Sequence, residues 1–188
     1  MALIIGLAGK ARSGKDTAFI YFSYHKFVRM ALADPLKELC RKMFKLTKEQ
    51  TDGALKEVVD PRYGLTPRSI LIKVGNDMRQ IHKEVWVEQL LEKIKSLPSD
   101  SRVVITDVRY KNEAKLLKEA GAYLARLERH VSRDSMVNEE TKQSLSETDL
   151  DDYQGWDFYL PGEQNENPQD LEKWVSKITD FLRAKEKK

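Results

Sequence analysis

The chain has 188 residues, of which 40% are hydrophobic, enough for one globular domain with a buried core. Its 33 basic and 30 acidic residues leave a net charge of only +3, which does not fit a protein that coats nucleic acid. A single cysteine excludes a disulfide framework and favours a reducing compartment such as the cytoplasm. No apolar run approaches the roughly 20 residues of a membrane span, so no membrane role is expected.

The N-terminal half begins with ALIIGLAG at 2–9, a short apolar run that ends in glycine and is typical of a buried parallel strand. Asp34 and Pro35 mark the start of a helix, because Asp can cap a helix and Pro is tolerated in its first turn. The expected elements are, in order, a strand at 2–9, a helix from 15 to about 28, a strand at 29–33 and a helix from 34 to about 46.

Thr66 and Pro67 repeat this helix-start signal before SILIKVGNDMRQI. The elements expected after this helix are a helix at 86–97, a strand at 102–109, a helix at 112–120, a strand at 122–127, an edge strand at 157–160 and an amphipathic helix at 170–182. Residues 132–156 are polar and poorly periodic, which predicts a mobile segment near 130–150. The alternation of strands and helices predicts an α/β fold with a mostly parallel sheet.

Residues 9–17, GKARSGKDT, nearly match the phosphate-binding loop G-x-x-x-x-G-K-[ST], but Asp16 stands where a magnesium-binding hydroxyl is expected. In such a loop, backbone N–H groups surround the phosphates, and Lys15 reaches the β- and γ-phosphates. The strand before the loop and the helix after it favour a nucleotide site over an ordinary glycine-rich turn. The expected ATP-binding residues are Gly9, Ser13, Gly14, Lys15, Asp16 and Thr17.

Arg12 adds a guanidinium inside this loop, where it could contact the transferring phosphoryl group, although it could also be a surface charge. Asp107 ends the hydrophobic strand VVITDVR, the arrangement of a Walker-B-like carboxylate that organises magnesium. Arg109, two residues further on, is expected to point the same way. A structural ion pair is the alternative for these two residues. The expected catalytic residues are Lys15, Arg12 and Arg109, and the expected metal ligands are Asp16 and Asp107.

The helix after Thr66 has two distinct faces when its residues are placed at 100° intervals. The apolar face, expected to be buried, consists of Ile70, Leu71, Val74, Met78 and Ile81. The opposite face carries Arg68 and Arg79 with Gly75 between them, so it could admit a base or sugar and bind a phosphate. Asn76 and Asp77 are candidates for hydrogen bonds to a base or ribose. A solvated helix face is the alternative.

Together these stretches resemble the deoxynucleoside monophosphate kinases encoded by tailed bacteriophages, within the P-loop nucleoside monophosphate kinase superfamily. The resemblance spans most of the chain. It is carried by KARSGKDTA at 10–18, LADPLK at 32–37, TPRSILIKVGNDMRQIHKEVW at 66–86 and DVRYKNEA at 107–114. It implies ATP- and Mg²⁺-dependent phosphoryl transfer to a deoxynucleoside 5′-monophosphate in the cytoplasm, that of the host if the protein is phage-encoded. Small nucleotides are then the partners, with no nucleic-acid polymer, and a homodimer is left open.

The resemblance also implies one P-loop NTPase domain over 1–188, with a three-layer fold, a helical monophosphate-binding region at 34–98 and a lid at about 129–156. The residues it places around the acceptor monophosphate are Lys37, Arg68, Gly75, Asn76, Asp77, Arg79 and Trp86. Those it places beside the lid are Arg126, Arg129 and Arg133. Family members carry a His shortly before a Ser-Glu pair, whereas residues 143–147 here read QSLSE, so no role is assigned to Glu147.

Two other functions remain compatible with the sequence. One is a P-loop kinase of another small acceptor, such as dephospho-coenzyme A or phosphomevalonate, because such kinases share the loop and the overall plan. The other is a nucleotide-dependent binding switch with negligible phosphoryl transfer. The identity of the acceptor separates these functions from one another.

Overall fold

The computed structural model describes residues 2–10, 13–128, 145–160 and 168–186 of the chain. It divides into two compact units, which we call the sheet unit (Met1–Ala31 with Lys93–Lys188) and the helical unit (Leu32–Glu92). Each unit is described separately below. That the two work as one kinase domain, with a monophosphate-binding region at 34–98 and a lid at 129–156, stays a prediction.

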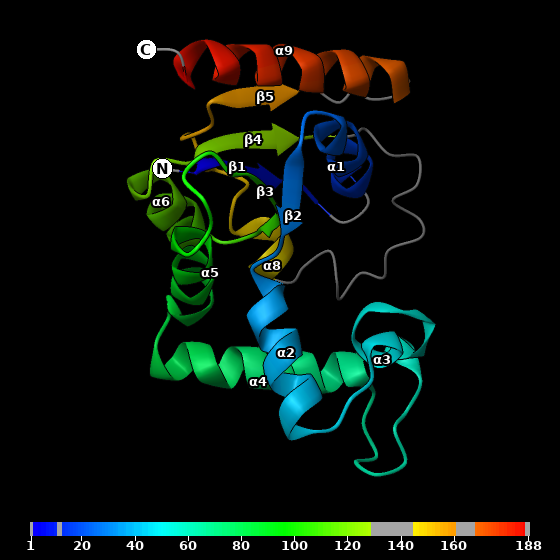
Figure 1. The fold of residues 1–188 in the computed structure, drawn as a ribbon. Helices are drawn as coiled ribbons and strands as arrows, with labels where there is room; N and C mark the ends of the chain where they lie inside the picture. Colours follow the sequence, from blue (N-terminus) through cyan, green and yellow to red (C-terminus); the bar gives the residue numbers. More distant parts are fainter. Residues whose placement is uncertain (1, 11–12, 129–144, 161–167, 187–188) are drawn as a thin grey trace. The chain divides into compact units, whose positions relative to one another are not determined.

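The sheet unit contains a five-stranded sheet in the order β2-β3-β1-β4-β5. The strands are β1 (Leu3–Ala8), β2 (Phe27–Met30), β3 (Arg102–Val108), β4 (Tyr123–Leu127) and β5 (Phe158–Leu160). Every pairing among them is parallel, which confirms the predicted sheet and places β5 at its edge. β1 lies at the centre, with β3 on one side and β4 on the other (Figure 1).

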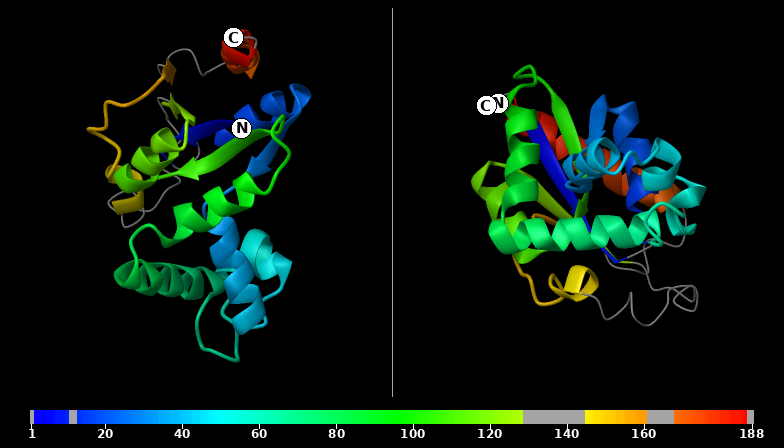
Figure 2. Two further views of the ribbon diagram at one scale, coloured as in Figure 1. Left: turned by 60° about the vertical axis from the view of Figure 1, so that its left-hand side comes forward. Right: turned by 90° about the horizontal axis from the view of Figure 1, so that it is seen from below.

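Helices cover both faces of this sheet and make three layers. α1 (Lys15–Tyr24) and α9 (Pro168–Glu186) pack on one face, where Phe22 and Val175 are fully buried with Ile5 of β1. Gly6 faces the opposite way, and a Cβ built on it would lie 3.6 Å from Leu117 of α6 (Lys111–Glu119). The sheet therefore lies between α1 and α9 on one side and α6 on the other (Figure 2).

The helical unit comprises α2 (Ala33–Met43), α3 (Lys48–Asp52), the 3₁₀ helix η1 (Ala54–Glu57), α4 (Pro67–Ile81) and most of α5 (Val85–Lys95). A small core of Cys40, Leu46, Ile70 and Leu71 joins α2 and the segment after it to α4. α4 begins as the sequence predicts, because the Thr66 side chain accepts a hydrogen bond from the backbone N–H of Ser69 and Pro67 occupies the first turn. None of the described helices is long and apolar enough to cross a membrane.

Several element boundaries differ from the sequence prediction. α1 ends at Tyr24, earlier than expected, because Lys26 adopts a left-handed φ of 65° that reverses the chain. β2 consequently begins at Phe27, within the segment expected to be helical. Leu32 occupies the N-cap position of α2 without a side-chain cap, and Asp34 lies in the first turn instead of at the cap.

The apolar face of α4 is shorter than its periodicity suggests. Ile70 and Leu71 are buried as expected, but Ile81 is 81% exposed. The amphipathic pattern therefore continues beyond the last turn that packs in the core.

Thr66→Ala should lower the free energy of unfolding by about 1 kcal/mol, because it leaves the Ser69 N–H of α4 without its side-chain acceptor. Thr66→Ser keeps the hydroxyl and should lose much less. Urea unfolding followed by far-ultraviolet circular dichroism measures both variants. Equal losses in the two variants would show that the Thr66 methyl group, and not the cap, provides the stability.

Candidate active site

The loop between β1 and α1 requires glycine at two positions. Gly9 has φ 154°, and a Cβ built on it would lie 2.4 Å from the Leu127 carbonyl oxygen and 2.5 Å from Ser13 Oγ. Gly14 has φ 97°, a left-handed conformation that other residues rarely adopt, and it caps α1. The predicted curl of the loop is therefore present, with the amino end of α1 directly after it (Figure 1).

Lys15 folds back over this loop. Its Nζ donates hydrogen bonds to the Gly9 carbonyl at 2.6 Å, the Lys10 carbonyl at 2.8 Å and Ser13 Oγ at 3.1 Å. Burial and the positive charge of Arg109 lower the pKa of Lys15 to about 8, against the opposing influence of nearby carboxylates. The ammonium is thus held by neutral oxygen atoms that carry less charge than a phosphate would.

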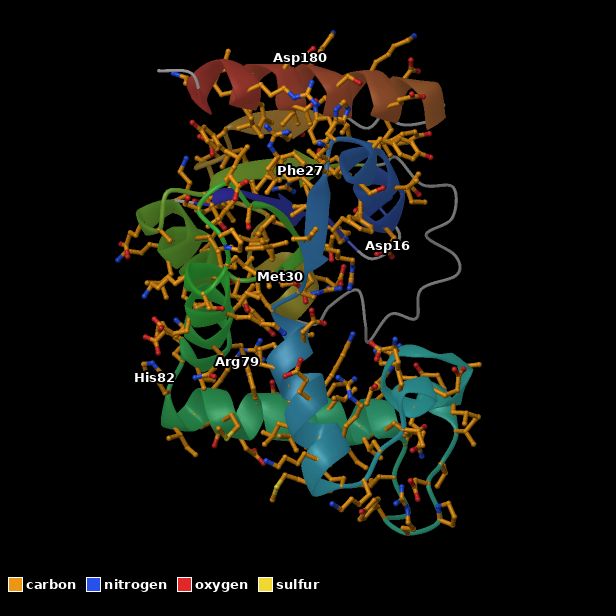
Figure 3. The ribbon with its side chains drawn as sticks, viewed as in Figure 1. Asp16, Phe27, Met30, Arg79, His82 and Asp180 are labelled. Carbon is orange, nitrogen blue, oxygen red and sulfur yellow. The ribbon has the colours of Figure 1, made fainter. Side chains whose placement is uncertain are left out.

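Three carboxylates surround Lys15 electrostatically: Glu147, Asp16 and Asp107 each act to raise its pKa. Asp16 is exposed in the first turn of α1 (Figure 3), and Asp107 is partly buried near the end of β3. The described residues contain no group of three or more acidic, His or Cys side chains that could enclose a metal ion. Two carboxylates beside a phosphate loop nevertheless suit Mg²⁺, which keeps several waters and binds substrate phosphates.

Arg109 forms an ion pair with Glu147, a residue for which no role is predicted from the sequence. Glu147 comes from the short helix α8 (Leu145–Thr148), and its side chain is only 5% exposed. The alternative to a catalytic role for Arg109 was a structural ion pair. The contact with Glu147 supports such an ion pair for Arg109, but with a carboxylate other than Asp107. Because Arg109 also influences Lys15, the pair belongs to the same electrostatic environment as the loop.

A buried glutamate fixes the turn that carries Arg109. Glu113 is 3% exposed, and its Oε2 accepts hydrogen bonds from the backbone N–H groups of Arg109 at 3.0 Å and Tyr110 at 3.1 Å. These bonds satisfy two donors at the amino end of α6. The sequence reasoning missed Glu113, although its place at the start of a helix after DVRYK was a capping signal.

Arg126 at the end of β4 binds the segment that follows α8. Its Nη1 donates to the Leu150 carbonyl at 2.8 Å, and its Nη2 lies 3.6 Å from Asp151 Oδ1. Asp151 also contacts Lys10 of the loop, with 3.3 Å between Nζ and Oδ2. Arg126 therefore lies beside a segment expected to belong to the lid. The other arginines expected there, Arg129 and Arg133, and Arg12 of the loop lie outside the described residues.

The predicted acceptor residues Lys37 and Arg68 both form ion pairs within the helical unit. Lys37 Nζ lies 2.6 Å from Asp52 Oδ1, and Arg68 contacts Glu57. Arg79 lies on α4, close to its carboxyl end (Figure 3). Asn76 and Asp77 are exposed. A nucleotide role for each of these residues stays a prediction.

Gly75 and Trp86 are enclosed by protein. A Cβ on Gly75 would lie 3.0 Å from Leu36 Cδ2 of α2. Trp86 is 4% exposed, and its indole N–H donates to the Gly75 carbonyl at 3.2 Å. The expectation of an open surface at Gly75 is therefore corrected, because Leu36 fills the space that the missing side chain leaves. Neither residue's surroundings support a nucleotide contact.

Comparison with solved structures agrees with this fold. Dephospho-CoA kinase from Campylobacter jejuni superposes with a TM-score of 0.56 at 12% identity, over 95% of this chain and 96% of that one. TT1252 from Thermus thermophilus gives a TM-score of 0.54 at 16% identity, also over 95% and 96% of the two chains. The fold is therefore that of the P-loop kinases.

Sequence comparison identifies the family of kinases to which the chain belongs. No protein-family model matches the chain. A protein of Acanthamoeba polyphaga mimivirus, provisionally named a deoxynucleotide monophosphate kinase, is 35% identical over 170 residues, which cover 79% of this chain and 86% of that protein. The chain belongs to the same kinase family, that of the deoxynucleotide monophosphate kinases. The expected kinase family is thus confirmed, and the bacteriophage type stays a prediction because this relative is from a mimivirus.

Lys15 should titrate near pH 8 in the free protein, because burial and Arg109 both favour its neutral form. Competitive acetylation over a pH series, followed by mass spectrometry of the Lys15 peptide, measures this pKa against Nα-acetyl-lysine amide, which titrates at about 10.4. ATP with magnesium should raise the pKa, because a phosphate anion stabilises the ammonium. Identical titration of Lys15 and the reference amine would contradict the described environment.

Proposed function

We propose that the protein transfers the γ-phosphoryl group of ATP to a deoxynucleoside 5′-monophosphate and releases ADP and a deoxynucleoside diphosphate. The observation that carries this proposal is the loop of Gly9 to Lys15, with Asp16, Asp107 and Arg109 close enough to change the pKa of Lys15. Positive groups and metal-binding carboxylates beside a phosphate loop are what phosphoryl transfer needs. The 35% identical relative supports a deoxynucleotide as the acceptor.

In the transfer step, an oxygen of the acceptor's 5′-phosphate forms a bond to the γ-phosphorus, and the bond to the β-phosphate oxygen breaks. ADP leaves with that electron pair. Lys15 would exchange its contacts with the Gly9 and Lys10 carbonyls for the β- and γ-phosphates. Arg109, positioned by Glu113, would neutralise negative charge that builds up on the leaving phosphate. Arg12 would add to this neutralisation from within the loop.

Bound magnesium would supply positive charge that reduces the repulsion between the phosphates and the attacking oxygen. Asp16 and Asp107 are the carboxylates that would hold it, directly or through water. Thr17, which follows Asp16 in α1, keeps a hydroxyl and a backbone amide for the phosphates. The segment at 129–156 would close over the site and exclude water, so that the phosphoryl group reaches the nucleotide and is not hydrolysed.

Coupled measurement of ADP release with all deoxy- and ribonucleoside monophosphates tests the function. We expect magnesium-dependent turnover with at least one deoxynucleoside monophosphate. Lys15→Ala should abolish it without changing the circular dichroism spectrum, because the hydrogen bonds of its side chain to the described residues all stay within its own loop. Absence of turnover across the panel would show that nucleoside monophosphates are not the acceptors. Turnover of dephospho-coenzyme A would then identify it as the acceptor for phosphoryl transfer from ATP bound at the same loop.

Asp16→Asn should raise the magnesium concentration needed for half-maximal turnover, because a neutral amide binds Mg²⁺ less well than a carboxylate. Binding of ADP without metal should be unchanged or tighter, since a negative charge beside the phosphates is removed. Asp180→Asn is the matched control, because Asp180 is an exposed carboxylate on α9 (Figure 3).

The rival explanation is that Asp16 only complements the dipole of α1, which is worth about 0.3 to 1 kcal/mol of stability. In that case the melting temperature of Asp16→Asn falls while its magnesium dependence equals that of the wild type. Asp107 would then be the main metal ligand.

A further inference from the structure

Four cations of the helical unit come together around two carboxylates. We call them the basic cluster: Lys37 and Arg41 of α2, Lys56 of η1 and Arg68 of α4. Asp52 contacts both Lys37, at 2.6 Å, and Arg41, with 3.2 Å between Nη1 and Oδ2. Glu57 contacts Arg68. The charge of Lys56 interacts with those of Lys37, Asp52, Glu57 and Arg68, so the cluster is continuous.

The charges within this cluster do not balance. Four cations face two carboxylates, which leaves two positive charges without a partner among these six side chains. A phosphate monoester carries about −1.5 to −2 charges near pH 7, since its second pKa is about 6. One such group would compensate the cluster, whereas a neutral sugar or base would not.

Of the four cations, Lys56 is the one whose charge is least compensated by carboxylates. In the described part of the helical unit, the other three members each contact a carboxylate, but the Lys56 side chain makes no hydrogen bond or ion pair. The residue is only partly exposed. Burial, and then the positive charges of Arg68 and Lys37, lower the pKa of its ammonium. An anion placed here would offset the repulsion among these positive charges.

The two ion-paired parts of the cluster differ in how readily they can exchange partners. The Arg68 and Glu57 side chains are 52% and 60% exposed, and exposed pairs of this kind contribute little to stability. Lys37 is 16% exposed, and Asp52 also accepts a hydrogen bond from the Thr51 hydroxyl at 2.9 Å. Arg68 is therefore free to turn to a ligand at small cost, while Asp52 anchors Lys37 and Arg41 behind it.

We propose that Lys56 and Arg68 bind a phosphate monoester, and that Lys37, Arg41 and Asp52 hold the surrounding charge in place. This inference deepens the proposed function, on which it rests for the identity of the ligand: the 5′-phosphate of the acceptor nucleotide. It adds Lys56 to the acceptor site and gives Lys37 a supporting position there.

Isothermal titration calorimetry without ATP tests this site directly. The probes are each deoxynucleoside 5′-monophosphate and the matching deoxynucleoside, which lacks only the phosphate. The wild type should prefer the monophosphate, and Lys56→Gln should lower that preference by about 10-fold to 100-fold, the effect of losing one charge-assisted contact. Lys56→Arg should keep most of it. Lys73→Gln, which removes an exposed lysine from α4, should leave it unchanged.

The turnover assay separates failure of this inference from failure of the proposed function. If the wild type phosphorylates a deoxynucleoside monophosphate but Lys56→Gln binds that nucleotide within twofold of the wild type, the site is wrong and the function stands. If monophosphates bind through Lys56 but none is phosphorylated, the site stands and the function is wrong. If the wild type shows no preference for monophosphate over nucleoside, the inference is overturned. Melting temperatures of the variants exclude unfolding as the cause.

Discussion

Parallel pairing of β1 with its two neighbours is the constraint on which the candidate active site depends. In register, Ala8 lies opposite Val108 of β3 and Arg126 of β4. Because parallel strands end at the same edge, this register brings the loop that follows β1 together with the ends of β3 and β4. Gly6 makes the close packing behind this edge possible, since a Cβ there would lie 2.8 Å from Leu124 Cδ2. The positions of Lys15, Asp107 and Arg126 therefore follow from backbone pairing in the core.

The electrostatics of the loop follow from that assembly. An ammonium enclosed near Arg109 is unfavourable, and burial, followed by the charge of Arg109, lowers the pKa of Lys15 to about 8. Three neutral oxygens of the loop hold it in the absence of phosphate. A phosphate supplies a full negative charge in their place, so binding should be stronger than the simple exchange of one hydrogen bond for another. The protein keeps Lys15 charged at neutral pH and holds it with neutral oxygen atoms that an anion can replace.

The sequence predicts well those features whose signals are local. The strand before the loop, the cap at Thr66 and the edge position of the strand at 158–160 depend on neighbouring residues, and all three are confirmed. The end of α1 was misplaced because it depends on a left-handed Lys26, and lysine has no particular preference for that conformation.

Contacts between distant residues could not be predicted in the same way. Arg109 and Glu147 are 38 residues apart, and no pattern in the sequence connects them. Leu36 reaches Gly75 across two helices, so a glycine that looks open along one helix is covered by another. No motif in the sequence indicates a role for Lys56. Its relevance depends on α2, α3, η1 and α4 bringing four cations and two carboxylates together.

The carboxylates in the basic cluster bear on selectivity as well as on stability. Four cations alone would attract any anion, including the polyphosphate chain of ATP, and would bind the most highly charged ligand most strongly. Asp52 and Glu57 reduce the excess to two charges, which a single monoester compensates, and they weaken the attraction to a larger charge. The loop in the sheet unit has the opposite design, because backbone N–H groups and a helix amino end can follow several phosphates in a row. Separate chemistry of this kind would let one chain distinguish a phosphoryl donor from its acceptor, although both are nucleotides.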